Sequence, residues 1–248
     1  MPNYVRNIVK MEGITDLPLF EMVDGEKHFN FNKLIPMPEE LCVASGSMTD
    51  EGVLYYLTRR CSVPICELGV QENALLCKLV HNMYSDNWHE ELLRRLSLRM
   101  KNAAESEKKQ LFDAGKQYIS NFEKYGAPTW YEWCCREWGT KWNACDTQIL
   151  DSDTIRFDTA WSNPAPIIRK LGQMYPNLEI EHWWADEDVG SNTGIRRLHA
   201  RTEDVSFYEG DAGAYDIYTK CWGEHACVYL DDNGVIQRKG CDVCGLCA

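Results

Sequence analysis

Hydrophobic and polar residues alternate along several short segments of the chain, which is typical of strands with one buried face. In residues 4–11, for example, Val5 and Val9 lie on one side of an extended chain, and Arg6 and Lys10 lie on the other. The same pattern predicts strands at residues 142–149, 154–161, 178–184, 194–200, 205–209, 214–222 and 226–230, with turns at 150–153 and 231–234. A sheet of short strands is therefore expected.

Helical patterns gather mainly between residues 46 and 127, where apolar residues recur at helical spacing. Helices are predicted at residues 14–20, 48–59, 72–84, 88–125 and 164–175, with Asp86 capping the fourth and Ser162 or Asn163 capping the last. Residues 29–40 are expected to be extended, because each residue before a proline is pushed out of helical geometry.

The order of these elements is strand, helix, helical insertion, strand, strand, helix and strand. This is the split βαβ pattern of a ferredoxin-like sandwich, which is an α+β fold with an antiparallel sheet and helices on one face. We therefore expect one ferredoxin-like domain over residues 1–248, with a helical insertion at about 46–127 and extra C-terminal strands. A cysteine-rich tail is expected from about residue 221 to the end.

The bulk properties narrow the class of protein. A net charge of −12 opposes direct binding to nucleic-acid backbone, and it suits either simple solubility or a partner with a basic surface. No leader pattern is visible, and no apolar run approaches the roughly 20 residues of a membrane span. Without a secretory signal, the 12 cysteines are expected to be reduced thiols, and the protein is expected to be cytoplasmic.

Five stretches of the chain form a recognisable set: the opening Met1–Asn3 strand, Phe31–Pro38, Trp138–Asn143, Phe157–Trp161 and Ala185–Asp188. Taken together, they resemble the Api92-like, or YubB, family of ferredoxin-like domain proteins. The resemblance implies a ferredoxin-like α+β fold and a home in phages, plasmids and pathogenicity islands, hence the cytoplasm of a bacterial host. It implies no iron–sulfur cluster and carries no established activity.

Tryptophans and polar residues cluster in the runs 138–144, 157–168 and 185–194, which flank predicted strands and should meet at one end of the sheet. The candidate ligand- or partner-binding residues are Trp138, Lys141, Trp142, Asn143, Asp158, Trp161, Asp186, Glu187, Asp188 and Asn192. Such a set forms a ligand pocket or a protein-binding patch, unless its tryptophans fill the core. Stacking of RNA bases is less favoured, because the aromatic-basic strand signature of that module is absent.

The acidic run also has the spacing of a calcium loop, with Asp186, Asp188 and Asn192 as oxygen ligands. Arg197 occupies the twelfth position, where a calcium loop needs a bidentate acid. A turn held by bonds between side chains and backbone explains the same residues and is the favoured interpretation.

The C-terminal cysteines form a second candidate site. Cys227, Cys241, Cys244 and Cys247 have spacings that suit a structural Zn²⁺ site, and Cys221 is an alternative fourth ligand. An iron–sulfur site, disulfides and free thiols in a loose tail remain as alternatives. The cysteines set among apolar residues are expected to fill the core; these are Cys42, Cys61, Cys66 and Cys77.

Signs of catalysis are sparse. The chain has no nucleophile elbow and no glycine-rich phosphate loop, so no catalytic residue is assigned. The one conceivable acid–base pair joins His182 to Asp158 or Asp186. We therefore expect a non-enzymatic interaction protein of a phage or mobile element that binds and modulates a host or defence protein.

Two alternatives remain from the sequence. One is a small-ligand or nucleotide-binding protein, possibly enzymatic, that uses the Trp138–Asn143 and Asp186–Asp188 turns. The other is nucleic-acid binding through the basic helix between Arg94 and Lys109, although a solvated face explains the same charges.

Overall fold

The computed structural model describes residues 3–61, 68–80, 87–200 and 202–239. Contacts along the chain divide it into two compact units. We call Met1–Pro36 with Cys134–Ala248 the sheet unit, and Met37–Trp133 the helical unit. Each is described by itself.

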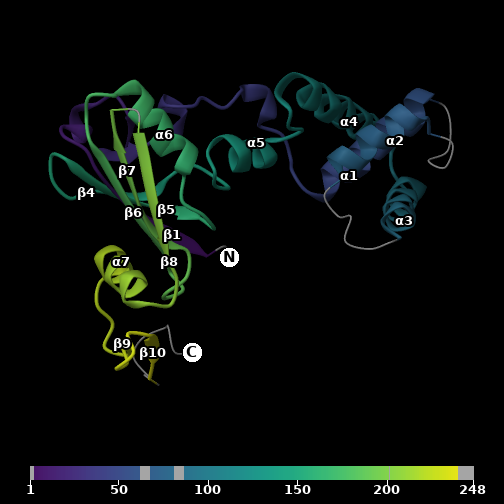
Figure 1. Ribbon diagram of the computed structural model, residues 1–248. Helices are drawn as coiled ribbons and strands as arrows, with labels where there is room; N and C mark the ends of the chain where they lie inside the picture. The colour runs from purple at the N-terminus through teal and green to yellow at the C-terminus, as the bar shows by residue number, and fades with distance from the viewer. Residues whose placement is uncertain (1–2, 62–67, 81–86, 201, 240–248) are drawn as a thin grey trace. The chain divides into compact units, whose positions relative to one another are not determined.

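The sheet unit is built on a six-stranded antiparallel sheet in the order β4-β5-β1-β6-β7-β8 (Figure 1). The strands are β1 (Tyr4–Lys10), β4 (Cys145–Ile149), β5 (Thr154–Ala160), β6 (Ile180–Asp186), β7 (Thr193–His199) and β8 (Thr202–Tyr208). The first four in spatial order, with helix α6 (Ala165–Met174) between β5 and β6, have the ferredoxin-like arrangement. The predicted α+β class and the extra C-terminal strands are confirmed.

Alternation along the strands gives the sheet two distinct faces. On the face that carries α6, the registers align Phe157, Asn7, Trp184, Gly194 and Phe207 in one row, and Ile155, Val9, His182, Arg196 and Val205 in the next. Phe157 packs against Phe29 and Phe31 at 5.1 and 5.9 Å between ring centroids, and Phe31 meets Trp138 at 5.7 Å. This aromatic group lies with α6 over the α6 face.

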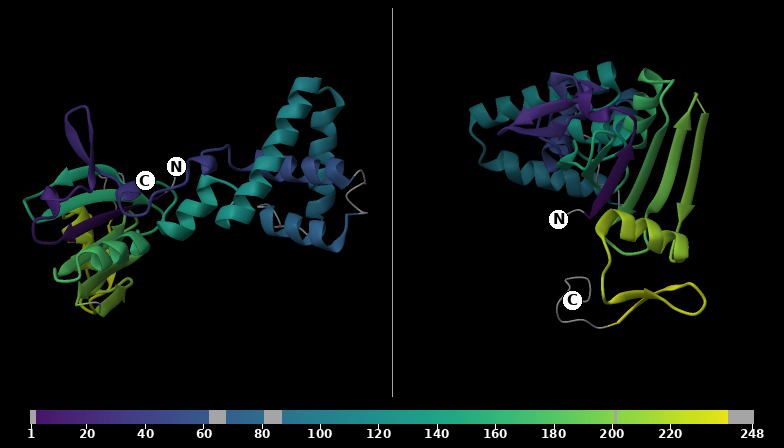
Figure 2. Two further views of the ribbon diagram at one scale, coloured as in Figure 1. Left: turned by 90° about the horizontal axis from the view of Figure 1, so that it is seen from above. Right: turned by 90° about the vertical axis from the view of Figure 1, so that its left-hand side faces the viewer.

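Helix α7 (Ala212–Trp222) packs on the opposite face, against Ile8 and Ala185. The prediction of a strand at residues 214–222 is therefore wrong. Asp211 caps the helix by accepting a hydrogen bond from the backbone N–H of Ala214. Its buried residues recur at helical spacing, and they are Ala214, Ile217, Tyr218 and Cys221. A hairpin of β9 (Val228–Leu230) and β10 (Ile236–Arg238) follows α7, as Figure 2 shows.

The segment after β1 also departs from the prediction. Instead of a helix at residues 14–20 there is one 3-10 turn, η1 (Ile14–Asp16), because Pro18 holds Leu17 in extended geometry. A hairpin of β2 (Phe20–Val23) and β3 (Glu26–Phe29) follows. Residues 29–40 are not uniformly extended, since η2 (Phe31–Lys33) and η3 (Glu39–Leu41) interrupt them. The side chain of Asn30 caps η2.

The cap predicted for α6 is also wrong. Pro164 stands at the cap position, and no side chain bonds to the first turn there. Ser162 donates its hydroxyl to the carbonyl of Gly139, and the Oδ1 atom of Asn163 accepts from Arg196 instead. Both predicted caps are thus used in tertiary bonds.

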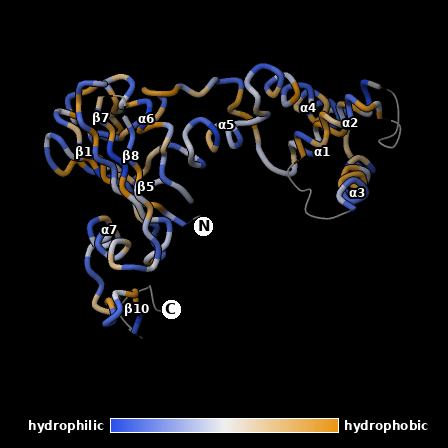
Figure 3. The backbone as a smooth tube through the Cα atoms, viewed as in Figure 1, coloured by the Kyte–Doolittle hydropathy of each residue, from blue (hydrophilic) through white to orange (hydrophobic). Residues whose placement is uncertain are grey.

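The helical unit contains α1 (Ser47–Cys61), α2 (Val70–Leu79), α3 (Trp88–Lys101) and α4 (Glu105–Tyr125). Helix α5 (Trp130–Glu137) spans the boundary between the two units. Apolar and polar stretches alternate on these helices in Figure 3. The shared core includes Leu54, Leu57, Leu76, Leu92, Leu96, Leu111 and Ile119. Among the residues that the structure describes, no helix is both long and apolar enough to cross a membrane.

The predicted helix at 88–125 is two helices. Asn102 ends α3, and Ala104 is extended with ψ 157°, so the chain changes direction before Glu105. Asp86, the predicted cap, lies outside the described residues, and Asn87 holds the cap position.

Candidate functional site

Three of the predicted site residues meet at one end of the sheet, around Asn3. The backbone N–H of Trp161 donates to the carbonyl of Asn3 at 2.9 Å. The amide Nδ2 of Asn3 donates to Asp186 at 3.3 Å, and Nδ2 of Asn192 donates to the carbonyl of Trp161 at 3.1 Å. The end of β5, the end of β6 and the start of β7 therefore share one set of bonds, which we call the Asn3 end.

Trp161 is the unusual residue of the Asn3 end. Its φ is +67°, a left-handed conformation that a bulky aromatic residue rarely adopts, and its side chain is 45% exposed. Such backbone strain costs on the order of 1–3 kcal/mol and persists only where surrounding contacts hold it. The bonds from Asn3 and Asn192 supply that constraint. The fold thus sacrifices some stability to hold an exposed tryptophan in place.

Lys141 places a positive charge against this aromatic surface. Its ammonium Nζ lies 4.6 Å from the ring centroid of Trp161 and 4.9 Å from that of Trp142, within cation–π range of both. Trp142 and Lys141 are half-buried. We call Lys141, Trp142 and Trp161 the tryptophan surface.

Trp138 and Asn143, in contrast, hold the fold together. Trp138 is 3% exposed and donates its indole N–H to the carbonyl of Ile35 at 2.9 Å. The side-chain oxygen of Asn143 accepts from the backbone N–H groups of Phe31 and Ala144, at 2.8 and 2.9 Å. The turn between them therefore anchors the aromatic cluster of the α6 face.

Asp158 lies on the other face of the sheet, the one that α7 covers. It is 4% exposed, and its two oxygens accept from Arg6 at 2.9 Å each. The guanidinium of Arg6 lies 3.9 Å from the ring centroid of Trp222. Burial disfavours the charge of Arg6, but the hydrogen bond and charge of Asp158 outweigh it and raise the pKa of Arg6. This pair stabilises the packing of α7.

The acidic run forms the turn favoured by the sequence. Asp186 accepts from the backbone N–H of Asp188 at 2.9 Å, and Asp188 pairs with Arg238 at 2.5 Å. The backbone N–H of Glu187 donates to the carbonyl of Tyr4. Within the described ranges, no three His, Cys, Asp or Glu side chains come together as a metal site requires.

The zinc hypothesis falls mostly on residues that are not described. Cys241, Cys244 and Cys247 lie outside the described residues, and Cys227 is 1% exposed beneath α7. Burial raises the pKa of the Cys221 thiol to about 12. A zinc site at this tail stays a prediction.

The cysteines predicted to fill the core do not all do so. Cys42 is exposed, so the prediction is wrong for this residue, and Cys77 is half-buried. The side chain of Cys61 and the whole of Cys66 lie outside the described residues. Cys42, Cys77, Cys145 and Cys221 carry free thiols.

The α6 face carries a buried chain of polar side chains that is not predicted from the sequence. His182 is fully buried, with Nε2 2.9 Å from Oδ1 of Asn7 and Nδ1 3.1 Å from a guanidinium nitrogen of Arg196. Arg196 in turn donates to Glu203 at 2.8 Å. The acid–base pair suggested for His182 is not formed, because its partners are an amide and a guanidinium. Since Arg196 can only donate, His182 is neutral with its proton on Nε2.

The charges of this chain are fixed by burial and pairing. Burial lowers the pKa of Arg196, and the hydrogen bond and charge of Glu203, which raise it, offset this effect only in part. Burial alone would raise the pKa of Glu203, but hydrogen bonds from Arg169 and Arg196 outweigh burial and lower it. His182 and Arg196 both fall on the buried face of predicted strands, and this alternation is the sequence signal that could have indicated their contact.

His182 makes stability depend on pH. Burial, and then the charge of Arg196, lower its pKa well below 6.5 in the folded protein. Below about pH 6.5 the unfolded chain therefore binds a proton that the folded protein does not, and the free energy of unfolding decreases by up to about 1.4 kcal/mol per pH unit. Urea unfolding between about pH 7.5 and pH 5, above the range where most carboxylates titrate, measures this slope.

The His182→Gln variant is the control for that slope. It removes the titrating ring, so its free energy of unfolding should be lower at every pH but nearly flat across this window. If the variant kept the wild-type slope, other groups would be responsible.

Part of the chain matches a known protein family. Residues 137–225 match the family model described as the ferredoxin-like domain in Api92-like protein. This segment is similar to the Api92-like domain. It runs from the end of α5 to just past α7 and includes β4 to β8, while the central strand β1 comes from outside it. The resemblance seen in the sequence is confirmed over these residues.

One solved structure is similar over most of the chain. It is the crystal structure of a protein api92 from Yersinia pseudotuberculosis, at 12% identity and a TM-score of 0.34, covering 84% of this chain and 98% of that one. No curated protein sequence matches the chain.

Proposed function

We propose that the protein acts by binding another protein through the tryptophan surface and that it is not an enzyme. The observation that carries the proposal is Trp161, a half-exposed indole held at φ +67° by Asn3 and Asn192. Exposed tryptophans fixed in position are the residues that most often dominate protein interfaces, because they lose little conformational entropy on binding.

The charge of the surroundings indicates the kind of partner. The chain carries a net charge of −12, and the exposed Asp188 and half-buried Glu187 lie in the same loop region as Asn192. A partner with an apolar pocket and a basic rim would match this surface. Following the Api92-like resemblance, we propose a host or defence protein as partner of a phage or mobile-element protein, in the bacterial cytoplasm.

The alternatives drawn from the sequence have less support. The polar groups of Asn143 and Asp186, on which the ligand-binding turns would depend, are engaged in bonds within the fold. Nucleic-acid binding by the basic helices is weakened by ion pairs, which are Arg95–Asp50 at 3.8 Å, Arg99–Glu51 at 2.9 Å and Lys108–Glu105 at 2.7 Å. Paired cations offer less charge to a phosphate backbone.

Removing the indole of Trp161 is expected to weaken partner binding strongly without unfolding the protein. Glycine tolerates a φ of +67°, so Trp161→Gly relieves the strain while it deletes the ring. We expect affinity for the partner to fall roughly 30-fold or more, the effect of losing an interface hot spot. Quantitative pull-down from bacterial lysate, followed by binding measurements on the enriched protein, gives the comparison.

A matched control comes from the same unit. Tyr229 on β9 is 46% exposed, close to the 45% of Trp161, so Tyr229→Ala deletes an aromatic ring of similar exposure elsewhere. It should leave the enriched protein bound. If no protein is enriched, or if Trp161→Gly enriches it as well as the wild type does, the proposal fails.

A further inference from the structure

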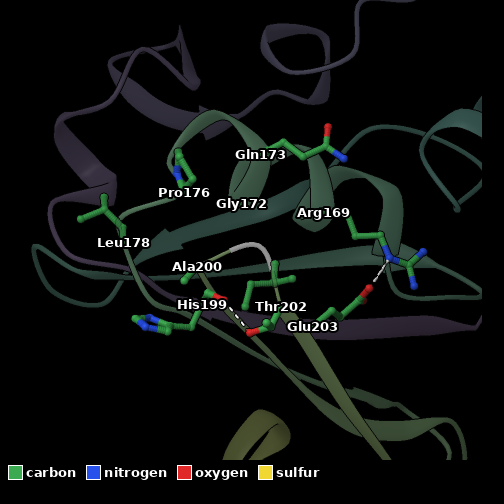
Figure 4. Close-up of a pocket in the computed structure, with 10 residues that line it drawn as sticks. Arg169, Gly172, Gln173, Pro176, Leu178, His199, Ala200, Thr202 and Glu203 are labelled. Atoms are coloured by element: carbon green, nitrogen blue, oxygen red, sulfur yellow. Dashed lines mark hydrogen bonds and ion pairs between the residues drawn. The ribbon is translucent and has the colours of Figure 1, made fainter.

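A pocket on the sheet unit, apart from the Asn3 end, has the features of a small-molecule site. It has a volume of about 430 Å³ and lies between the C-terminal half of α6 and the turn from β7 to β8 (Figure 4). Its lining comprises Arg169, Gly172, Gln173, Pro176, Leu178, Leu198, His199, Ala200, Thr202 and Glu203. Volumes of this size accommodate small organic ligands.

The pocket has a polar end and an apolar end. Figure 4 shows Arg169 and Glu203 joined at one end, with Pro176 and Leu178 toward the other. Gly172 contributes to the space between them, since it adds no side chain to the face of α6 that meets Leu198. A ligand that fits this pattern has a charged or polar head and an apolar body.

The polar end has an excess of donors over acceptors. Nε of Arg169 donates to the two oxygens of Glu203 at 3.0 and 2.8 Å, and Arg196 donates to one of these oxygens at 2.8 Å. One carboxylate thus serves two guanidiniums, one of them buried. Arg169 makes these two bonds through Nε, and its guanidinium has further N–H groups that suit an anionic head.

Two residues that line the pocket, Ala200 and Thr202, have defined backbone or side-chain geometry. Ala200 has a φ of +46°, a left-handed conformation that is uncommon for alanine, and Thr202 donates its hydroxyl to the carbonyl of His199 at 2.6 Å. The ring of His199 pairs with Glu179 at 3.2 Å, at the end away from Arg169, so these two groups leave the head position to Arg169.

We propose that this pocket binds a small organic monocarboxylate, with its carboxylate on Arg169 and its aliphatic or aromatic body against Leu178 and Leu198. A cationic head is disfavoured, because the oxygens of Glu203 already accept three hydrogen bonds from arginines. The site is separate from the tryptophan surface, so it stands or falls independently of the proposed protein partner.

The test uses octanoate and phenylacetate as probes, with octanamide and phenylacetamide as uncharged counterparts of the same shape. Titrations of the full chain are followed through the methyl NMR signals of Leu178 and Leu198. We expect the carboxylates to shift these signals and the amides to bind at least about tenfold more weakly, because a charge-assisted hydrogen bond is lost. The two probes also show whether the body is aliphatic or aromatic.

Two substitutions of exposed arginines make a matched pair. Arg169→Gln removes the proposed head contact, and Arg196 still pairs with Glu203, so the fold should persist. Arg197→Gln breaks an exposed pair with Glu181 at 3.1 Å, outside the pocket lining. The first should weaken carboxylate binding about tenfold or more, and the second should leave it unchanged.

A third variant fills the space itself. Gly172→Leu places a side chain from α6 into the pocket, and leucine favours the helix. It should eliminate the methyl shifts for both carboxylates. The proposal is overturned if the amides bind as well as the acids, if Arg169→Gln binds like the wild type, or if no probe shifts Leu178 and Leu198.

Discussion

Replacing Gly115 with alanine is expected to destabilise the helical unit by about 3 kcal/mol or more, since overpacking of this severity forces the backbone apart. A Cβ atom at Gly115 would overlap the carbonyl oxygen of Gly52 on α1 and would lie 2.8 Å from Cβ of Tyr56. The first obstacle is backbone, so no rotamer change relieves it. Helices α1 and α4 would have to separate at Gly52 and Gly115, where their backbones approach each other.

Gly52→Ala is the matched control, because the same two helices meet there with more room. A Cβ at Gly52 has its nearest neighbours at 3.2 Å, on the ring of Tyr118, and at 3.3 Å, on the backbone of Gly115. Alanine improves helix propensity by up to about 1 kcal/mol, so this variant should be close to neutral.

Hydrogen exchange of the amides in α1 and α4, with thermal unfolding, measures both variants. For a unit of this size, a loss of about 3 kcal/mol corresponds to roughly 12–24 °C in Tm. Equal behaviour of the two glycine variants would mean that the helices tolerate separation and that the close crossing does not stabilise the unit.

The sequence predicts the sheet well because its signal is local. Val5 and Val9 alternate with polar residues, and the strands β1, β5 and β6 follow from that alternation alone. Helix α7 is wrongly predicted as a strand, because residues 214–222 are rich in tyrosine and β-branched residues, which favour strands. The spacing of Ala214, Ile217 and Tyr218 is helical and indicates the correct structure, but the strand prediction rests on composition.

The candidate site was predictable in its location but less so in its chemistry. Runs that flank strands do meet at the Asn3 end, as loop positions imply. Whether a polar residue there is available depends on partners far away in sequence, such as Phe31 for Asn143 and Arg6 for Asp158. The left-handed backbone of Trp161 has no sequence signature at all, since tryptophan is among the residues least suited to it.

The pocket is not predicted from the sequence either, because residues that are distant along the chain form it. Arg169 and Glu203 are far apart in the chain and unremarkable as exposed charges on a helix and a strand. Only the packing of α6 across the β7–β8 turn brings them together beside apolar side chains. Its location therefore follows from tertiary structure, whereas the tryptophan surface could be anticipated from clustering.

Gly194→Ala is expected to destabilise the sheet unit by about 3 kcal/mol or more, again by overpacking. The glycine ends the acidic run and begins the strand predicted at residues 194–200, and it lies in β7 opposite Trp184. A Cβ there would overlap the edge of the Trp184 indole and would lie 2.8 Å from the carbonyl oxygen of Ser206. Trp184 is fully buried, and the rings of His182 and Phe207 lie 5.1 and 5.7 Å from it, so the indole has no room to move away.

A double-mutant cycle isolates this contact from any effect of alanine on the strand. Trp184→Leu alone should cost about 3 kcal/mol through the cavity that it leaves. In the Trp184→Leu background the indole is absent, so Gly194→Ala meets only the carbonyl oxygen of Ser206, and the double variant should be destabilised by no more than about 1 kcal/mol relative to Trp184→Leu. The expected coupling is therefore most of the cost of Gly194→Ala. Additive losses in urea unfolding would show instead that Ser206 or the strand backbone, and not the indole, requires glycine at this position.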